Sequence, residues 1–100
     1  MNTKPAVSAI IVNWNGAHHL RICLPSLLSQ TLTSLEIIVV DNGSKDDSVE
    51  VARELQARWL PLGENVGLAP ALNRGAKAAA GDFLLFINND MRSLQDSWQR

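Results

Sequence analysis

Three short apolar segments, each followed directly by asparagine or aspartate, limit what this chain can fold into. They span residues 7–12, 35–40 and 83–87. Segments of this length with apolar residues on both faces are typical of strands buried in a parallel sheet that helices cover. Ligands of such open sheets bind outside the carboxyl ends of the strands. Asp41, which follows the second segment, and Asn88, Asn89 and Asp90, which follow the third, therefore lie at the edge where a binding site is expected.

Helical periodicity fills the stretches between these segments. Apolar residues recur at three- and four-residue spacing over residues 17–28, 49–55 and 68–80. Ser44 and Asp47 have the spacing of a capping box before the second of these helices, and Gly81 is the expected stop of the third. Gly75 is expected to let that third helix approach the sheet closely.

A fourth, shorter apolar piece lies at residues 59–62 and contains Pro61. Proline cannot donate to a central ladder, so this piece is expected to be an edge strand. The regular alternation of strand and helix predicts one α/β domain over residues 1–100. Its architecture is three-layer α/β/α, with a mainly parallel sheet of about four strands joined by right-handed crossovers.

Composition excludes several classes of function. Nine basic and ten acidic side chains leave a formal charge of −1, which gives no electrostatic basis for binding nucleic acid. The single cysteine, Cys23, falls on the apolar stripe of the first helix and is expected in the core. With no signal-peptide pattern and no apolar run long enough to span a bilayer, a cytoplasmic location is expected, and attachment of a full-length protein to the inner face of the membrane is left open.

Four linked motifs carry a family resemblance. They are Val7–Asn15, Val39–Ser44, Glu64–Gly67 with Asn73–Gly75, and Gly81–Asp90. In this order and spacing the chain resembles the family 2 glycosyltransferases, over about residues 6 to 91, and is similar to bacterial rhamnosyltransferase-like members. The resemblance implies a GT-A fold whose Rossmann-like amino-terminal half binds a nucleotide diphosphate sugar. It also implies inverting transfer of the sugar to an acceptor hydroxyl in polysaccharide or glycoconjugate synthesis.

Asp41 and Trp14 are the candidates for holding the nucleotide base. A carboxylate at a strand end can accept the ring N–H of uracil or thymine, and the resemblance supports that role for Asp41; the alternative is a turn-forming aspartate that bonds its own backbone. Trp14 could stack on the base, as the family's aromatic at this position does, or simply pack in the core. The nucleotide-binding set that the resemblance implies is completed by Val12, Asn15, Asn65 and Asn89. Asn65 is also suited to shaping its loop.

Asn88, Asn89 and Asp90 match the family's D-x-D motif, which holds Mg²⁺ or Mn²⁺ across the two phosphates. Asp90 occupies the last acidic position, whereas Asn88 stands in the first. An amide oxygen can ligate a hard cation without neutralising it, so metal binding is expected to be weak and assisted by the substrate. The alternative is a strand-ending turn in which Asn and Asp are chosen for conformation.

The resemblance implies a UDP- or dTDP-sugar donor and a saccharide or lipid-linked acceptor. A carboxylate base should deprotonate the acceptor hydroxyl, but no residue here matches it, because in the family it lies further along the chain. We therefore expect a donor-binding part of a longer transferase that is inactive alone. If the last strand normally pairs with later strands, its exposed edge invites a homodimer.

A second hypothesis is a non-catalytic, doubly wound regulatory or assembly module. Receiver domains share strand-end acids, but the buried acid cluster and the lysine they need cannot be placed in this chain. A dinucleotide-binding domain is disfavoured because Asn15-Gly16-Ala17 follows the first strand in place of a glycine-rich phosphate turn. Binding of UDP or dTDP would separate the transferase from these alternatives.

Overall fold

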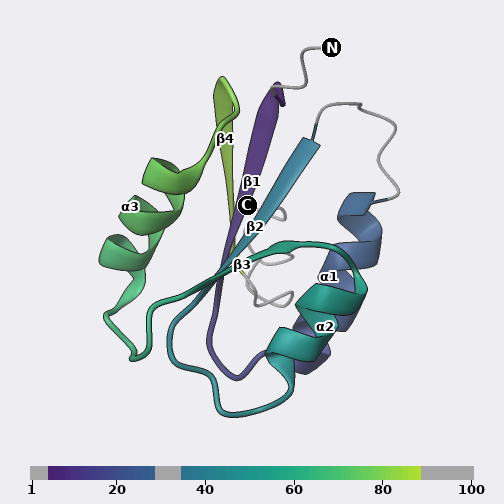
Figure 1. Ribbon diagram of the computed structural model, residues 1–100, viewed down its shortest axis with the longest axis vertical. Helices are drawn as coiled ribbons and strands as arrows, with labels where there is room; N and C mark the ends of the chain where they lie inside the picture. Colours follow the sequence, from purple (N-terminus) through teal and green to yellow (C-terminus); the bar gives the residue numbers. More distant parts are fainter. Residues whose placement is uncertain (1–4, 29–34, 89–100) are drawn as a thin grey trace, which may run out of the picture.

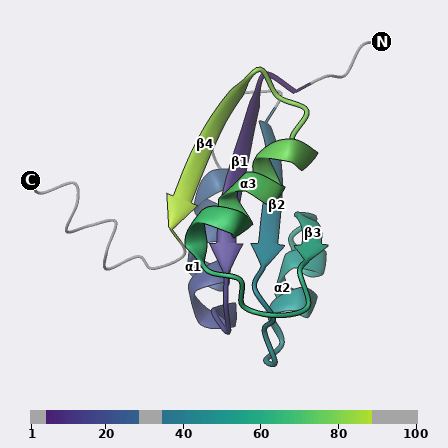
Figure 2. The ribbon, with the colours of Figure 1, turned by 90° about the vertical axis from the view of Figure 1, so that its left-hand side faces the viewer.

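The computed structural model describes residues 5–28 and 35–88. Its centre is a 4-stranded, entirely parallel sheet in the order β3-β2-β1-β4, which Figure 2 shows with all arrows pointing the same way. The strands are β1 (Val7–Asn13), β2 (Leu35–Asp41), β3 (Arg58–Pro61) and β4 (Phe83–Asn88). The predicted edge position of the proline-containing strand is confirmed. From β1 the chain adds β2 and then β3 on one side, whereas β4 is added on the other side of β1. The carboxyl ends of β1 and β4 therefore form the switch point where such sheets bind ligands.

Helices cover both faces of the sheet. Figure 1 shows α1 (Ala17–Leu28) and α2 (Ser48–Glu54) on one side and α3 (Leu68–Ala78) on the other. Alternate residues of β1 and β2 face the two layers: Ala9, Ile11, Ile37 and Val39 pack with α1 and α2, and Ile10, Ile38 and Val40 pack with α3. Cys23 is buried in the first of these cores, as expected. The predicted three-layer α/β/α architecture is confirmed.

Gly75 lets α3 lie directly on the sheet. A Cβ at this position would come within 2.5 Å of Ile10 Cγ2 and 2.8 Å of Val40 Cγ2. Ala71, one turn earlier on the same helix, is fully buried against the same strands. The expected close approach of this helix is therefore confirmed.

The predicted end of the third helix is wrong. The helix expected over residues 68–80, with Gly81 as its stop, ends at Ala78, and its cap residue Ala79 is already extended. Gly81 instead packs against β1, where an added Cβ would lie 2.7 Å from Ser8 Oγ.

In the part of the chain that the structure describes, no helix is long and apolar enough to cross a membrane.

The burial predicted for the last apolar segment is also wrong. β4 pairs with β1 on one side and forms the edge of the sheet. Four of its side chains are exposed: Phe83 by 70%, Leu84 by 42%, Leu85 by 46% and Phe86 by 49%. The described helices pack mainly on β1, β2 and β3. Ile87 of β4 is partly buried against the core under α1 and α2. The most apolar strand of the chain is thus its most accessible one.

Candidate nucleotide-binding site

Asp41 lies at the carboxyl edge of the sheet and is held by its neighbours. The register places Asn13 of β1 directly beside it, and both side chains are buried. Asn13 Nδ2 donates to Asp41 Oδ1 at 3.0 Å, and Ser44 N–H donates to Asp41 Oδ2 at 2.8 Å. The Ser44 hydroxyl also donates to Oδ1. Asp41 therefore does bond its own turn, the alternative weighed above, and its carboxylate is fixed in one orientation.

The capping box predicted for Ser44 is wrong. Its hydroxyl is committed to Asp41 and accepts from Asn13 Nδ2 at 3.1 Å and from Asn15 N–H at 2.7 Å. The second helix begins later, at Ser48. Asp46 serves its start instead, because Asp46 Oδ1 accepts from Ser48 N–H at 3.0 Å and from the Ser48 hydroxyl. Ser44 thus belongs to the site and not to the helix.

Asp46 joins the starts of both helices on this side of the sheet. Asp46 Oδ1 bonds Ser48, and Asp46 Oδ2 accepts from Ala17 N–H at 3.1 Å. Ala17 is the first residue of α1. Burial raises the pKa of the Asp46 carboxyl, but the hydrogen bonds from Ser48 and Ala17 outweigh it and leave the pKa below its usual value. The carboxylate form is therefore the one that the fold stabilises.

Two asparagines tie the surrounding loops together. Asn15 has a left-handed backbone (φ 50°), and its side-chain oxygen accepts from Lys45 N–H at 2.7 Å. Asn42 is buried, accepts from Val66 N–H and donates to Gly67 O, both at 3.2 Å. The loops that follow β1, β2 and β3 are in this way linked to one another at the carboxyl edge.

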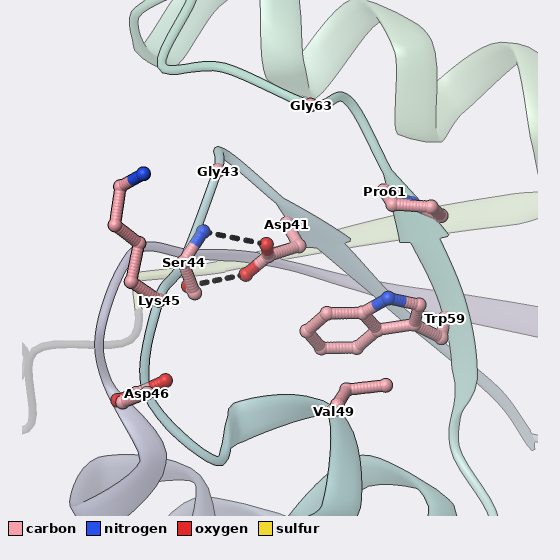
Figure 3. A pocket seen from close by; sticks show the side chains of 9 residues that line it. All are labelled: Asp41, Gly43, Ser44, Lys45, Asp46, Val49, Trp59, Pro61 and Gly63. Carbon is pink, nitrogen blue, oxygen red and sulfur yellow. Dashed lines mark hydrogen bonds between the residues drawn. The ribbon is translucent and has the colours of Figure 1, made fainter.

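A pocket of about 340 Å³ opens beside Asp41. Figure 3 shows the Asp41 carboxylate on one side and the indole of Trp59 reaching in from β3 beside Val49 of α2. The remaining lining residues are Gly43, Ser44, Lys45, Asp46, Pro61 and Gly63. Its walls combine an apolar surface with two hydrogen-bonded carboxylates, those of Asp41 and Asp46. An apolar lining with a few placed polar groups is the usual character of a small-molecule site.

The predicted site residues do not all meet in this pocket. Trp14 directly follows β1 at the same edge but does not line the pocket, and 57% of its surface is exposed, so the core-packing alternative is wrong. Val12 packs against the α3 core. Asn65 is exposed, and its side chain accepts from Gly67 N–H at 2.9 Å, which suits a role in shaping the loop.

The predicted metal site falls at the end of what the structure describes. Asn88 is the last residue of β4 and pairs with Val12, next to the switch point. Asn89 and Asp90 lie outside the described residues. Among the residues that are described, no group of three His, Cys, Asp or Glu side chains could hold a metal ion. The cation site at Asn88 and Asp90 stays a prediction.

Three residues of the site escaped sequence reasoning. The sequence pattern places Trp59 only in an edge strand, although Pro61, two residues later, pairs with Asp41 in a parallel register. Asparagine after a strand is typical of a turn, yet Asn13 and Asn42 are both buried and bonded. The available signal was position: each lies at or near the carboxyl end of a strand, where parallel neighbours converge.

Comparison with known proteins places the chain among transferases. The family model "Glycosyl transferase family 2" matches residues 8–100. The uncharacterized glycosyltransferase YibD of Escherichia coli is 37% identical over an alignment 94 residues long, which covers 90% of this chain and 27% of YibD. Glycosyltransferase AglE of Haloferax volcanii is 34% identical over an alignment 106 residues long with its gaps, which covers 99% of this chain and 35% of AglE. The chain thus spans only about a third or less of these relatives.

Solved structures agree with this placement. S. aureus TarS 1-349 in complex with UDP-GlcNAc superposes with a TM-score of 0.80 at 26% identity, covering 94% of this chain and 30% of that one. Mannosyltransferase PcManGT from Pyrobaculum calidifontis, in complex with GDP-Man and Mn2+, gives a TM-score of 0.80 at 25% identity, covering 87% and 28%. The parallel α/β sheet described above is that of the GT-A glycosyltransferases. This chain belongs to glycosyl transferase family 2.

Proposed function

We propose that this chain binds the donor of an inverting glycosyltransferase, a nucleoside diphosphate sugar, at the carboxyl edge of its sheet. The observation that carries the proposal is the fixed Asp41 carboxylate in the wall of a pocket at that edge. Asp41 Oδ2 accepts one hydrogen bond, from Ser44 N–H, among the described residues. A carboxylate oxygen can accept a second, so the ring N–H of uracil or thymine is a suitable partner.

The proposed donor is a UDP- or dTDP-sugar of the hexosyl type. Structures of neighbouring proteins in complex with UDP-GlcNAc, with GDP-Man, and with uridine diphosphate and glucosyl-3-phosphoglycerate support a nucleotide sugar as the donor. The choice of uracil or thymine as the base rests on the Asp41 carboxylate. Rhamnosyl specificity stays a prediction. The acceptor is proposed to be a saccharide or a lipid-linked group, activated by a base that this chain does not supply.

A divalent cation, Mg²⁺ or Mn²⁺, is proposed to act with the segment from Asn88 to Asp90. Structures of two neighbouring proteins contain Mn2+, which supports cation use in such proteins. When bound, a cation of this kind neutralises charge on the departing nucleoside diphosphate. Among the described residues, the chain contributes the base contact at Asp41 and the hydrogen bonds from Asn13 and Ser44 that orient it.

Calorimetric titration of the full-length protein with UDP and dTDP, with and without Mn²⁺, tests the proposal. We expect Mn²⁺ to strengthen nucleotide binding by the wild type. Binding by Asp90→Ala should not depend on Mn²⁺, and Asp41→Ala should lose selectivity for the base. The absence of any nucleotide binding by the full-length protein would refute the proposal and favour a non-catalytic module.

We also propose that the 100-residue chain pairs with a second copy through β4. The outer edge of β4 is not paired with any described strand, and its exposed side chains are large and apolar. The opposite edge strand, β3, carries Arg58 and Pro61, which disfavour pairing there. Association is therefore directed to the β4 side of the sheet.

A further inference from the structure

We propose that Ser8, Glu36 and Gly81 form a latch that fixes the register of β4 against β1, and that they are thereby positioning residues for the donor site. The inference rests on the proposed function, in which the segment that begins at Asn88 acts with the cation. It goes beyond that function because the latch lies at the amino ends of β1, β2 and β4, at the opposite end of the sheet from the donor site (Figure 2).

The apolar pattern of β4 does not define its register. Both faces of the strand carry side chains that are between 42% and 70% exposed, Phe83 and Leu85 on one face and Leu84 and Phe86 on the other. Ile87 is the residue of β4 that packs against a core of the described residues. A strand with one buried face resists slippage, because a shift by one residue exchanges its two faces. In β4 such a shift exchanges one apolar face for another, so burial against the described residues opposes it only weakly.

Hydrogen bonds tie the turn before β4 to the starts of β1 and β2. The hydroxyl of Ser8, which is fully buried, donates to Glu36 Oε1 at 2.6 Å and accepts from Gly81 N–H at 2.9 Å. Glu36 Oε1 also accepts from Ala80 N–H at 3.0 Å. Two successive backbone N–H groups of the turn are therefore held by one pair of side chains.

Gly81 makes the latch specific for one register. A Cβ at this position would lie 2.7 Å from Ser8 Oγ, 2.8 Å from Ser8 N and 2.8 Å from Val7 C. Two of these three atoms belong to the backbone of β1, which cannot turn aside as the end of a side chain can. A shift by one residue would bring Ala80 or Asp82 to this place, and both carry a Cβ. The observed register alone puts the residue without a side chain beside Ser8.

The same register fixes where the carboxyl end of β4 lies. Asn88 pairs with Val12 at the carboxyl edge of the sheet. Slippage by one residue would move this end by about 3.3 Å along the strand. Oxygen ligands lie about 2.0–2.1 Å from Mg²⁺, so the displacement exceeds the length of a metal–ligand bond. A slipped β4 would therefore not present Asn88 and Asp90 to a cation at the same place.

Methyl NMR of the full-length protein measures the register directly. Ile87 pairs with Ile11 and packs against the core that contains Ile11. We expect a nuclear Overhauser contact between the methyl groups of these two residues in the wild type, and its loss or weakening in Gly81→Ala. Ser8→Ala should act in the same direction and keeps the test decisive if Gly81→Ala fails to fold. Ala80→Ser, the control in the same turn, has an exposed side chain and keeps its N–H, so it should retain the contact.

Calorimetric titration of the same proteins with UDP, with and without Mn²⁺, measures the effect on the donor site. We expect the gain in affinity from Mn²⁺ to fall by on the order of 10-fold in Ser8→Ala and Gly81→Ala, as when a residue that orients metal ligands is removed. The affinity without Mn²⁺ should change by less than about 3-fold, because Asp41 lies outside the latch. Val51→Ala is the control for stability alone, since Val51 is buried on α2. It should lower the free energy of unfolding and leave the gain from Mn²⁺ unchanged.

The two measurements separate failure of the latch from failure of the proposed function. A contact between Ile11 and Ile87 that persists unchanged in Ser8→Ala and Gly81→Ala would overturn the latch, whether or not the protein binds UDP. Absence of UDP binding by the wild type would refute the proposed function and with it the positioning role. If the wild type binds UDP, a gain from Mn²⁺ that is unchanged in the latch variants, or that falls equally in Val51→Ala, would overturn the positioning role alone.

Discussion

One hydroxyl group, that of Ser44, joins the loops that follow β1 and β2. It donates to Asp41 and accepts from Asn13 Nδ2 and Asn15 N–H. Ser44→Ala leaves these two donors without that acceptor, and a donor left unsatisfied in a partly buried site costs about 1–3 kcal/mol. We expect a loss of about 1–3 kcal/mol in the free energy of unfolding, measured by urea denaturation, together with weaker UDP binding.

Lys45→Ala is the matched control for that prediction. The neighbouring Lys45 bonds Asn15 through its backbone N–H, which the substitution leaves in place, and its side chain is exposed. The free energy of unfolding should therefore change by less than about 0.5 kcal/mol. Equal losses in the two variants would show that the Ser44 hydroxyl does not hold the loops together.

At the scale of single elements, the contact between α3 and the sheet depends on Gly75. Alanine is the better helix former by about 1 kcal/mol, so propensity alone predicts that Gly75→Ala stabilises the protein. The added Cβ would instead collide with Ile10 and Val40. Because overpacking costs about 1–3 kcal/mol, we expect a net loss of stability in thermal or urea unfolding.

Asn73→Ala on the same helix provides the comparison. Asn73 is exposed, so the substitution changes helix propensity without adding a core contact. We expect a small gain of a few tenths of a kcal/mol. If Gly75→Ala also gained stability, the close packing of α3 on β1 and β2 would be contradicted.

Glu36 connects several elements at the opposite, amino-terminal end of the sheet. Its Oε1 accepts from the Ser8 hydroxyl at 2.6 Å and from Ala80 N–H at 3.0 Å, and its Oε2 accepts from Arg58 at 3.3 Å. Burial raises the pKa of the Glu36 carboxyl, but the hydrogen bonds from Ala80, Ser8 and Arg58 outweigh it, so the pKa lies below its ordinary value. The carboxylate thus stabilises the turn that leads into β4.

This pKa shift gives the stability a defined dependence on pH. A carboxyl with a lower pKa in the folded state stabilises the fold above its unfolded-state pKa, and this contribution is lost as the pH falls through the folded-state value. We expect Glu36→Gln to be less stable than the wild type by about 1–2 kcal/mol at neutral pH, and the difference to shrink between about pH 5 and pH 3. Asp46 is present in both proteins and cancels in the comparison. A difference that stayed constant down to pH 3 would contradict this role.

The elements also show what sequence could and could not predict. Strand and helix positions, the edge position of β3 and the close approach at Gly75 were predictable because each depends on local pattern or on one residue's chemistry. The role of Ser44 was not predictable, because the bond to Asp41 competes with helix capping. The exposure of β4 was not predictable either, because an apolar pattern indicates a buried environment without showing which segment covers it.

At the scale of the whole molecule, the exposed β4 predicts self-association of the 100-residue chain. Light scattering at increasing concentration should show a mass approaching twice that of the monomer. Leu85 is 46% exposed in the middle of β4, and Leu85→Lys places a charge in the proposed interface. We expect this variant to remain monomeric at concentrations where the wild type is a dimer.

Ile22→Lys is the control for surface hydrophobicity in general. Ile22 lies on α1 and not on the edge strand, and its exposed fraction of 45% is almost the same as that of Leu85. The variant should dimerise like the wild type. A wild type that is monomeric at high concentration, or equal effects of the two substitutions, would refute pairing through β4.

For the molecule as a whole, we propose that the carboxyl edge of the sheet binds a nucleotide through Asp41. A crystal structure of the full-length protein with UDP and Mn²⁺ tests this most directly. We predict that N3 of uracil lies within hydrogen-bonding distance of Asp41 and that the diphosphate extends toward the end of β4. Electron density for UDP elsewhere on the protein, with no contact to Asp41, would contradict the account.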